Sequence, residues 1–199
     1  MLSLAGAVLS ACLPSNDAAS TDDRAIAALP PQTPKINMNN SSSNCRIRDE
    51  IPFSDATTLS LPEIDVQSLQ AQDQNLAKDA PLRYAIAAEV NIDASDYGRW
   101  EKADDDMQVW RLKIISPQAL SLSLGFTSFN MPAQGCLFVY SPDRRQILGP
   151  YTSADNAEHG QLWTPTIDGE EVILEVSLPK DQISRLQLVL GFVNQGYKQ

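Results

Sequence analysis

The stretch EVILEVSLPKDQISRLQLVLGFV, residues 171–193, contains two runs in which apolar and polar side chains alternate. Four apolar residues share one face in each run: Val172, Leu174, Val176 and Leu178, then Leu186, Leu188, Leu190 and Phe192. A period of two is typical of a β-strand, because successive side chains point to opposite sides of the sheet. Residues 171–193 therefore predict two strands, each with one face in the core.

Similar runs occur upstream, at residues 83–92, 109–115, 120–126 and 136–140. In the run 120–126, Leu120, Leu122, Leu124 and Phe126 form the apolar face. Ser-Pro, Asn-Met-Pro and Ser-Pro-Asp turns separate the runs, and Asp168-Gly169 predicts a tight hairpin, because such turns need positive φ. About seven short strands with polar faces favour a mainly β fold, an antiparallel, jelly-roll-like β-sandwich.

Residues 58–79 have a different composition, in which Gln, Ala, Leu and Lys favour helix. The helix is expected to start near Pro62, with Glu63 and Asp65 in its first turn. The sequence therefore predicts one short helix before the sandwich, and together they form a domain over residues 58–199.

The N-terminus has the pattern of an export signal. Residues 2–11 are apolar but shorter than the roughly 20 residues needed to span a bilayer. Leu9-Ser10-Ala11-Cys12 resembles a bacterial lipobox, which predicts lipid attachment at Cys12, although no Lys or Arg precedes the apolar run. A buried helix with a core cysteine is the alternative. We expect residues 1–12 to direct export, which makes the protein an envelope lipoprotein that contacts the membrane only through the lipid. Without lipid attachment it would be periplasmic or extracellular.

Residues 13–57 are rich in Pro, Ser, Asn and Asp and poor in large apolar side chains. Such a segment buries too little surface to offset the entropy of ordering it, so the sequence predicts a disordered tether. If Cys12 carries lipid, Cys45 and Cys136 remain as a possible disulfide in an oxidising compartment. Such a bridge stabilises by about 4 kcal/mol in the chain-entropy model. Two unlinked cysteines are the alternative.

The formal net charge of −10 repels phosphate backbones, so we expect no nucleic-acid partner.

His159 is the one histidine of the chain and the one candidate for a catalytic base. No G-x-S-x-G elbow surrounds a serine, and a turn at the surface explains His159 better. Asp104, Asp105 and Asp106 lack the spacing and the glycine of a calcium loop, so they predict a solvated turn.

Adjacent Glu170 and Glu171 would point to opposite faces, which argues against a paired-carboxylate hydrolase with Asp168. The sequence thus predicts no catalytic residue, no metal site and no cofactor.

Aromatic side chains offer another possibility, a platform on which a glycan stacks. The candidates are Trp100, Trp110, Trp163, Tyr97, Tyr140 and Tyr151. Trp110 is in phase with core leucines and is expected to be buried, whereas Trp100 and Trp163 lie near strand ends, where exposure is expected. Core packing is the competing explanation for all six.

Several segments together resemble a known family. They are Gly98-Arg99-Trp100, Val109-Trp110-Arg111-Leu112, Gly149-Pro150-Tyr151-Thr152, Trp163-Thr164-Pro165 and the closing Gly196-Tyr197-Lys198. In this order they resemble the N-terminal, non-catalytic region of bacterial secreted trypsin-like serine endopeptidases of the lysyl endopeptidase type. The resemblance covers roughly residues 60–198, and Glu170 stands where the family usually has Asp.

The resemblance implies a non-catalytic pro- or accessory domain that assists or masks a protease catalytic domain. The catalytic motifs of the family are missing from this sequence, so we expect no enzyme activity from the chain itself. Two versions remain open. The chain is a truncated or split protease, or it is a stand-alone, lipid-anchored envelope module that binds a partner protein or a glycan.

Overall fold

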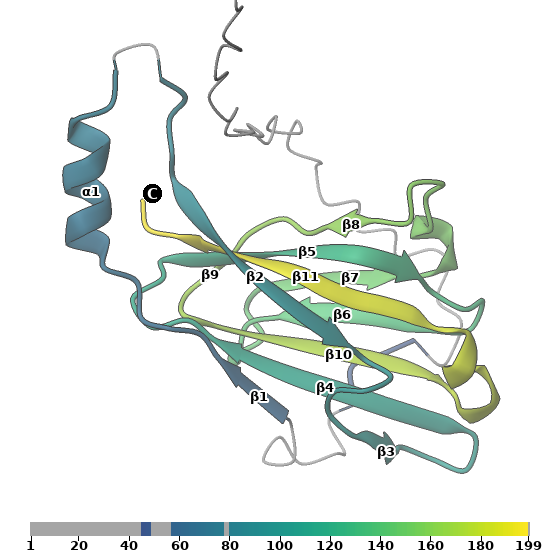
Figure 1. The fold of residues 1–199 in the computed structure, drawn as a ribbon. Helices are drawn as coiled ribbons and strands as arrows, with labels where there is room; N and C mark the ends of the chain where they lie inside the picture. The colour runs from purple at the N-terminus through teal and green to yellow at the C-terminus, as the bar shows by residue number, and fades with distance from the viewer. Residues whose placement is uncertain (1–44, 49–56, 78–79, 199) are drawn as a thin grey trace, which may run out of the picture. The chain divides into compact units, whose positions relative to one another are not determined.

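The computed structural model describes residues 45–48, 57–77 and 80–198 (Figure 1). The chain divides into Met1–Pro31 and Gln32–Gln199, and every described residue belongs to the second unit. The described residues are mainly β, with two sheets, one short α-helix and no closed barrel. The predicted sandwich class is therefore confirmed, whereas the expected export signal at residues 1–12 lies outside the described residues.

Sheet A has the strand order β1-β4-β10-β6-β7, with β3 also paired to β4, and sheet B has the order β2-β11-β5-β8, with β9 also paired to β5. The strands of sheet A are β1 (Thr57–Ser60), β3 (Trp100–Lys102), β4 (Met107–Ile115), β6 (Cys136–Tyr140), β7 (Ile147–Tyr151) and β10 (Glu171–Pro179). Those of sheet B are β2 (Ala85–Asp93), β5 (Ser121–Asn130), β8 (Leu162–Trp163), β9 (Ile167–Asp168) and β11 (Gln187–Gly196). Helix α1 spans Val66–Gln74, and two 3₁₀ turns span Ser153–Asp155 and Lys180–Arg185.

Strand pairing is nested along the chain. The outermost pair is β2 with β11 in sheet B, followed by β4 with β10 in sheet A. Next come β5 with β8 and β9 in sheet B, and innermost is β6 with β7 in sheet A. All these pairs are antiparallel, and their alternation between two sheets is the arrangement of a jelly roll.

One pair departs from the predicted antiparallel arrangement, because β1 runs parallel to β4. A parallel pair needs a long crossover between its strands. Here the chain passes through α1 and β2 of the other sheet before it reaches β4, which supplies that crossover (Figure 1).

The main core lies between the two sheets. Its members from sheet A include Trp110, Leu112 and Leu174, and those from sheet B include Leu124 and Phe126. All are at most 1% exposed, so the predicted core faces of 109–115 and 171–178 are confirmed. Leu120 differs from the expectation: it precedes the first residue of β5 and is 41% exposed.

Phe192 also differs from the expected core position. Leu190 pairs with Phe126 and Val193 pairs with Leu124, so β11 carries one more residue than β5 between these two pairs. This irregularity is a β-bulge, which reverses the alternation of side chains. Val193 returns to the core, whereas Phe192 pairs with Gly125 and does not join the core cluster.

The segment before the helix is more extended than predicted. Thr57–Ser60 forms β1, and α1 begins only at Val66, so Glu63 and Asp65 precede the helix rather than lying in its first turn. Asp65 is the N-cap residue, since its Oδ1 accepts the backbone N–H of Ser68 at 2.9 Å. Leu61 and Ile64 are buried in the main core, and this anchoring keeps the segment extended until residue 65.

The predicted hairpin at Asp168-Gly169 is wrong. Asp168 ends β9, which pairs with β5 of sheet B, whereas β10 begins at Glu171 and pairs with β4 and β6 of sheet A. The φ of +109° at Gly169 is the positive value expected from the sequence, but it turns the chain from one sheet into the other.

Truncating the core should cost far more stability than truncating the exposed leucine. Leu174 is 0% exposed, so Leu174→Ala should lower the free energy of unfolding by about 2–5 kcal/mol. Leu120→Ala, with the same change in chemistry at a 41% exposed position, should cost at most about 0.5 kcal/mol. Urea unfolding followed by circular dichroism measures both; equal losses would contradict the assigned core.

Candidate functional site

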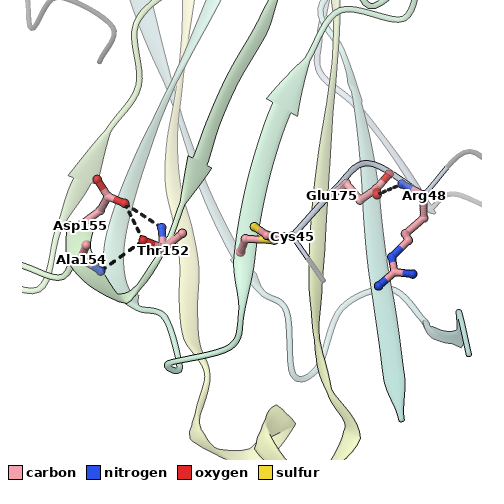
Figure 2. Close-up of a disulfide and its surroundings, with 7 residues drawn as sticks. Cys45, Arg48, Thr152, Ala154, Asp155 and Glu175 are labelled. Carbon is pink, nitrogen blue, oxygen red and sulfur yellow. Dashed lines mark hydrogen bonds between the residues drawn. A yellow bond between two sulfur atoms is a disulfide. The ribbon is translucent and has the colours of Figure 1, made fainter. Parts of the chain in front are cut away.

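Residues 45–48, here called the strap, cross the outer face of sheet A. A disulfide joins Cys45 to Cys136 of β6, with their Cα atoms 5.9 Å apart (Figure 2). Cys45 and Ile47 pack on a second apolar cluster formed by Cys136, Phe138, Tyr140 and Ile173. The structure therefore brings together the two cysteines for which the sequence left a disulfide open, and both faces of β6 are buried.

Glu175, in the middle of β10, is the centre of a buried polar cluster beneath the strap. Its Oε1 accepts the backbone N–H of Arg48 at 2.6 Å (Figure 2). Its Oε2 accepts the Nε–H of Arg111 at 2.8 Å and the hydroxyl of Tyr140 at 2.9 Å. Arg111 also donates to the carbonyl oxygen of Arg48. Three strands of sheet A and the strap are thus joined through one carboxylate.

Burial sets the electrostatics of this cluster. The side chains of Glu175 and Arg111 are 0% and 4% exposed. Desolvation, followed by the charge and hydrogen bond of Glu175, raises the pKa of Tyr140, so this hydroxyl stays protonated and donates. A guanidinium partner and further donors fix the buried carboxylate of Glu175 in one geometry.

The structure around the strap differs from two expectations drawn from the sequence. Residues 45–48 belong to the expected tether 13–57, yet they are fixed to sheet A, and Thr57 begins β1; residues 13–44 and 49–56 lie outside the described residues. Strand β10 was expected to have one polar face, but eight of its nine residues are buried. The strap packs on the outer face of sheet A around Ile173 and Glu175, a contact that the sequence pattern does not reveal.

A second polar cluster ties α1 to the last residues described. Lys198 Nζ and Arg83 Nη2 lie 2.5 and 2.9 Å from the carboxylate oxygens of Asp73. The hydroxyl of Tyr197 donates to Asp73 at 2.8 Å and accepts from Arg83 Nε at 2.9 Å. Tyr197 is 1% exposed, so the closing Gly-Tyr-Lys motif packs against the domain.

His159 lies on an exposed turn between β7 and β8. Its Nδ1 accepts the backbone N–H of Gln161 at 3.1 Å. In a serine-protease triad the corresponding Nδ1–H donates to a carboxylate, which holds the ring in the tautomer needed for a general base. The bond at His159 has the opposite direction and stays within the turn, in agreement with the predicted surface role.

The three aspartates 104–106 form the predicted turn between β3 and β4. Asp104 Oδ1 accepts the backbone N–H groups of Asp106 and Met107 at 3.1 and 2.8 Å. These bonds lower the pKa of Asp104, with the Met107 bond as the largest cause. Within the described ranges no group of three His, Cys, Asp or Glu residues is arranged to hold a metal ion.

Two of the three tryptophans among the aromatic candidates have the predicted exposure. Trp110 is 1% exposed and Trp163 is 37% exposed, whereas Trp100 is only half-buried and packs against the core. The sequence singled out none of Glu175, Arg111 and Asp73. The position of Glu175 within a largely apolar strand was the one sequence signal for this cluster. Its partner Arg111 could not be predicted, because that pairing depends on the register between β10 and β4.

In the part of the chain that the structure describes, no helix has the length and apolar character needed to cross a membrane. A family model described as the lysyl endopeptidase N-terminal domain matches residues 58–190. That range runs from β1 into β11 and so includes most of both sheets. No solved structure matches the chain.

Neutralising Glu175 should be strongly destabilising, because the buried guanidinium of Arg111 would lose its interaction with the charge of Glu175. We expect Glu175→Gln to lower the free energy of unfolding by about 3–5 kcal/mol. Glu171→Gln is the matched control on the same strand, since Glu171 pairs with Lys113 of β4 at 2.7 Å with both side chains partly exposed. The control should lose less than about 1 kcal/mol. Urea unfolding compares them, and a loss at position 175 as small as the control would refute the central role of this carboxylate.

Acid should weaken the cluster around Asp73. Its hydrogen bond with Lys198 is the largest cause that lowers the pKa of Asp73 below 3.8, and desolvation opposes it. A lowered folded-state pKa adds stability above the unfolded-state value, and this stability is lost as the pH falls through the folded-state value.

The urea midpoint should therefore fall more below about pH 4 in the wild type than in Asp73→Asn. Asp105→Asn serves as the control, since Asp105 is 97% exposed beside Lys102, and it should follow the wild type. Parallel pH profiles for the wild type and Asp73→Asn would contradict the assignment.

Proposed function

Because this chain belongs to the family of lysyl endopeptidase N-terminal domains, we propose that it is a non-catalytic accessory domain of a trypsin-like serine endopeptidase. In this role it assists the folding of a catalytic domain or masks that domain. The observation that carries the proposal is the family match over residues 58–190, which spans most of the jelly roll. The partner is then a catalytic domain that lies outside these 199 residues.

The placement of polar groups supports a scaffolding role. The hydrogen bond of His159 does not suit a general base, and the buried carboxylate Glu175 is held by structural partners rather than by an open site. A domain that assists the folding of a catalytic domain, or masks it, needs a rigid surface. The strap, the disulfide and the Glu175 cluster supply such rigidity on sheet A.

Mixing the chain with a separately prepared lysyl endopeptidase catalytic domain tests the proposal. If the chain assists folding, it raises the yield of active enzyme recovered from denaturant. If it masks the enzyme, it lowers the steady-state hydrolysis of a lysyl peptide substrate in a saturable way. Gel electrophoresis at the end of each assay checks that the chain is intact and is not simply a competing substrate.

Glu171→Gln, which should keep the fold, is the matched control and should act like the wild type, whereas chain unfolded by reduction in urea should not act. If neither the yield nor the rate changes with excess folded chain, the accessory role is refuted. Hydrolysis of lysyl substrate by the chain alone, abolished in His159→Ala, would refute its non-catalytic character.

We also propose that the protein is exported and carries lipid at Cys12. The apolar run before Cys12 and the secreted character of the family support this proposal. The proximity of Cys45 and Cys136 agrees with an oxidising compartment, in which a disulfide persists. In a bacterial host, mass spectrometry of the membrane fraction should find a lipidated Cys12, and Cys12→Ser should move the protein to the soluble fraction.

Peptide mapping without reductant should recover Cys45 and Cys136 in one linked pair. An unmodified Met1 N-terminus in the membrane fraction would refute lipidation, and two free thiols in exported protein would refute the bridge.

A further inference from the structure

Trp163 lies on the outer face of sheet B with its ring against a glycine. Leu162 packs on the main core, so the next residue of β8 points to the opposite face. Trp163 pairs with Gly125 of β5, where a Cβ atom would lie 2.4 Å from the indole ring. The ring therefore covers the position that a side chain at residue 125 would occupy, while 37% of Trp163 stays exposed.

A second ring accompanies the first because of the bulge in β11. Phe192 points outward beside Gly125, and its ring lies nearly parallel to that of Trp163, with centroids 5.7 Å apart and planes at 20°. Bulges re-aim side chains and are common next to functional sites. Neither Trp163 nor Phe192 belongs to a described core cluster, so burial in the core does not account for this pair.

The neighbouring positions on this face are small or polar. Next to the aromatic pair, Asn194 of β11 lies opposite Ser123, and its Nδ2–H donates to Ser123 Oγ at 3.2 Å. Glu89 of β2 lies opposite Phe192 and is exposed. The amide, the hydroxyl and the carboxylate provide both donors and acceptors beside the rings.

We propose that this face binds a neutral oligosaccharide, with one pyranose ring stacked on Trp163. A β-1,4-linked pyranose with equatorial substituents presents a flat face of C–H groups, which suits the negative face of an aromatic ring. Its hydroxyl groups match Asn194, Ser123 and Glu89 as partners. The net charge of −10 and the carboxylate of Glu89 next to the rings disfavour an anionic polysaccharide, and ring stacking with hydroxyl hydrogen bonds needs no charge on the sugar. This inference does not depend on the accessory role proposed above.

Titration with cellotetraose and with chitotetraose, followed by tryptophan fluorescence and by calorimetry, tests the proposal. Trp110 is buried and Trp100 is half-buried on the other sheet, so a fluorescence change reports mainly on Trp163. We expect saturable binding of at least one of the two oligosaccharides. The response to each oligosaccharide identifies whether the site prefers glucose or N-acetylglucosamine units.

Trp163→Ala should weaken binding about tenfold or more, whereas Trp163→Phe, which keeps a ring over Gly125, should retain measurable binding. Trp100→Phe is the control and should leave both the affinity and the fluorescence change as in the wild type. Circular dichroism verifies the fold of each variant, and Glu89→Ala offers a second, exposed test position that should also weaken binding. Absence of saturable binding by the wild type, or binding unchanged in Trp163→Ala, would overturn the proposal and leave Trp163 as a cover for Gly125.

Discussion

The nested pairing of strands makes both sheets depend on the last two strands of the domain. Strand β10 pairs with β4 on one side and β6 on the other, and β11 pairs with β2 and β5 in the same way. Neither sheet is continuous until residues 171–196 are in place. Contacts of this kind join positions far apart in sequence. Forming them costs loop-closure entropy before the packing between the strands can stabilise the fold. The fold is therefore one cooperative unit rather than a series of hairpins.

Polar contacts on the outer face of sheet A add to the stabilisation that the apolar core provides. The main core fills the space between the sheets, but the outer face of sheet A is also apolar around Ile173 and Phe138 and needs a cover. The strap supplies that cover, and Glu175 fixes it by accepting from Arg48, Arg111 and Tyr140. Sheet B has no such cover among the described residues, and its outer face carries small polar side chains with Trp163 and Phe192. The two faces thus have different roles, one structural and one open to a ligand.

Alternation of side chains predicted the strands well, because the period of two follows from backbone geometry alone. It predicted the core positions of Leu174 and Trp110 but failed at Phe192, where a bulge shifts the phase by one residue. It also failed at Asp168-Gly169, since a local turn signal does not specify which sheet the next strand joins. The Glu175 cluster could not be predicted from the sequence for a similar reason. Its members are separated by as many as 127 residues, and only the register brings them together.

The position of Cys45 determines how the domain responds to mechanical load. Cys45 and Cys136 are 91 positions apart, and the disulfide closes the chain between them into a covalent loop that contains β1 to β5 and α1. Tension applied through the residues ahead of Cys45 passes directly into β6, in the interior of sheet A, and bypasses β1. Stretching the chain from its two ends can therefore extend only the chain outside this loop, and five of the eleven described strands cannot be unravelled while the bond is intact.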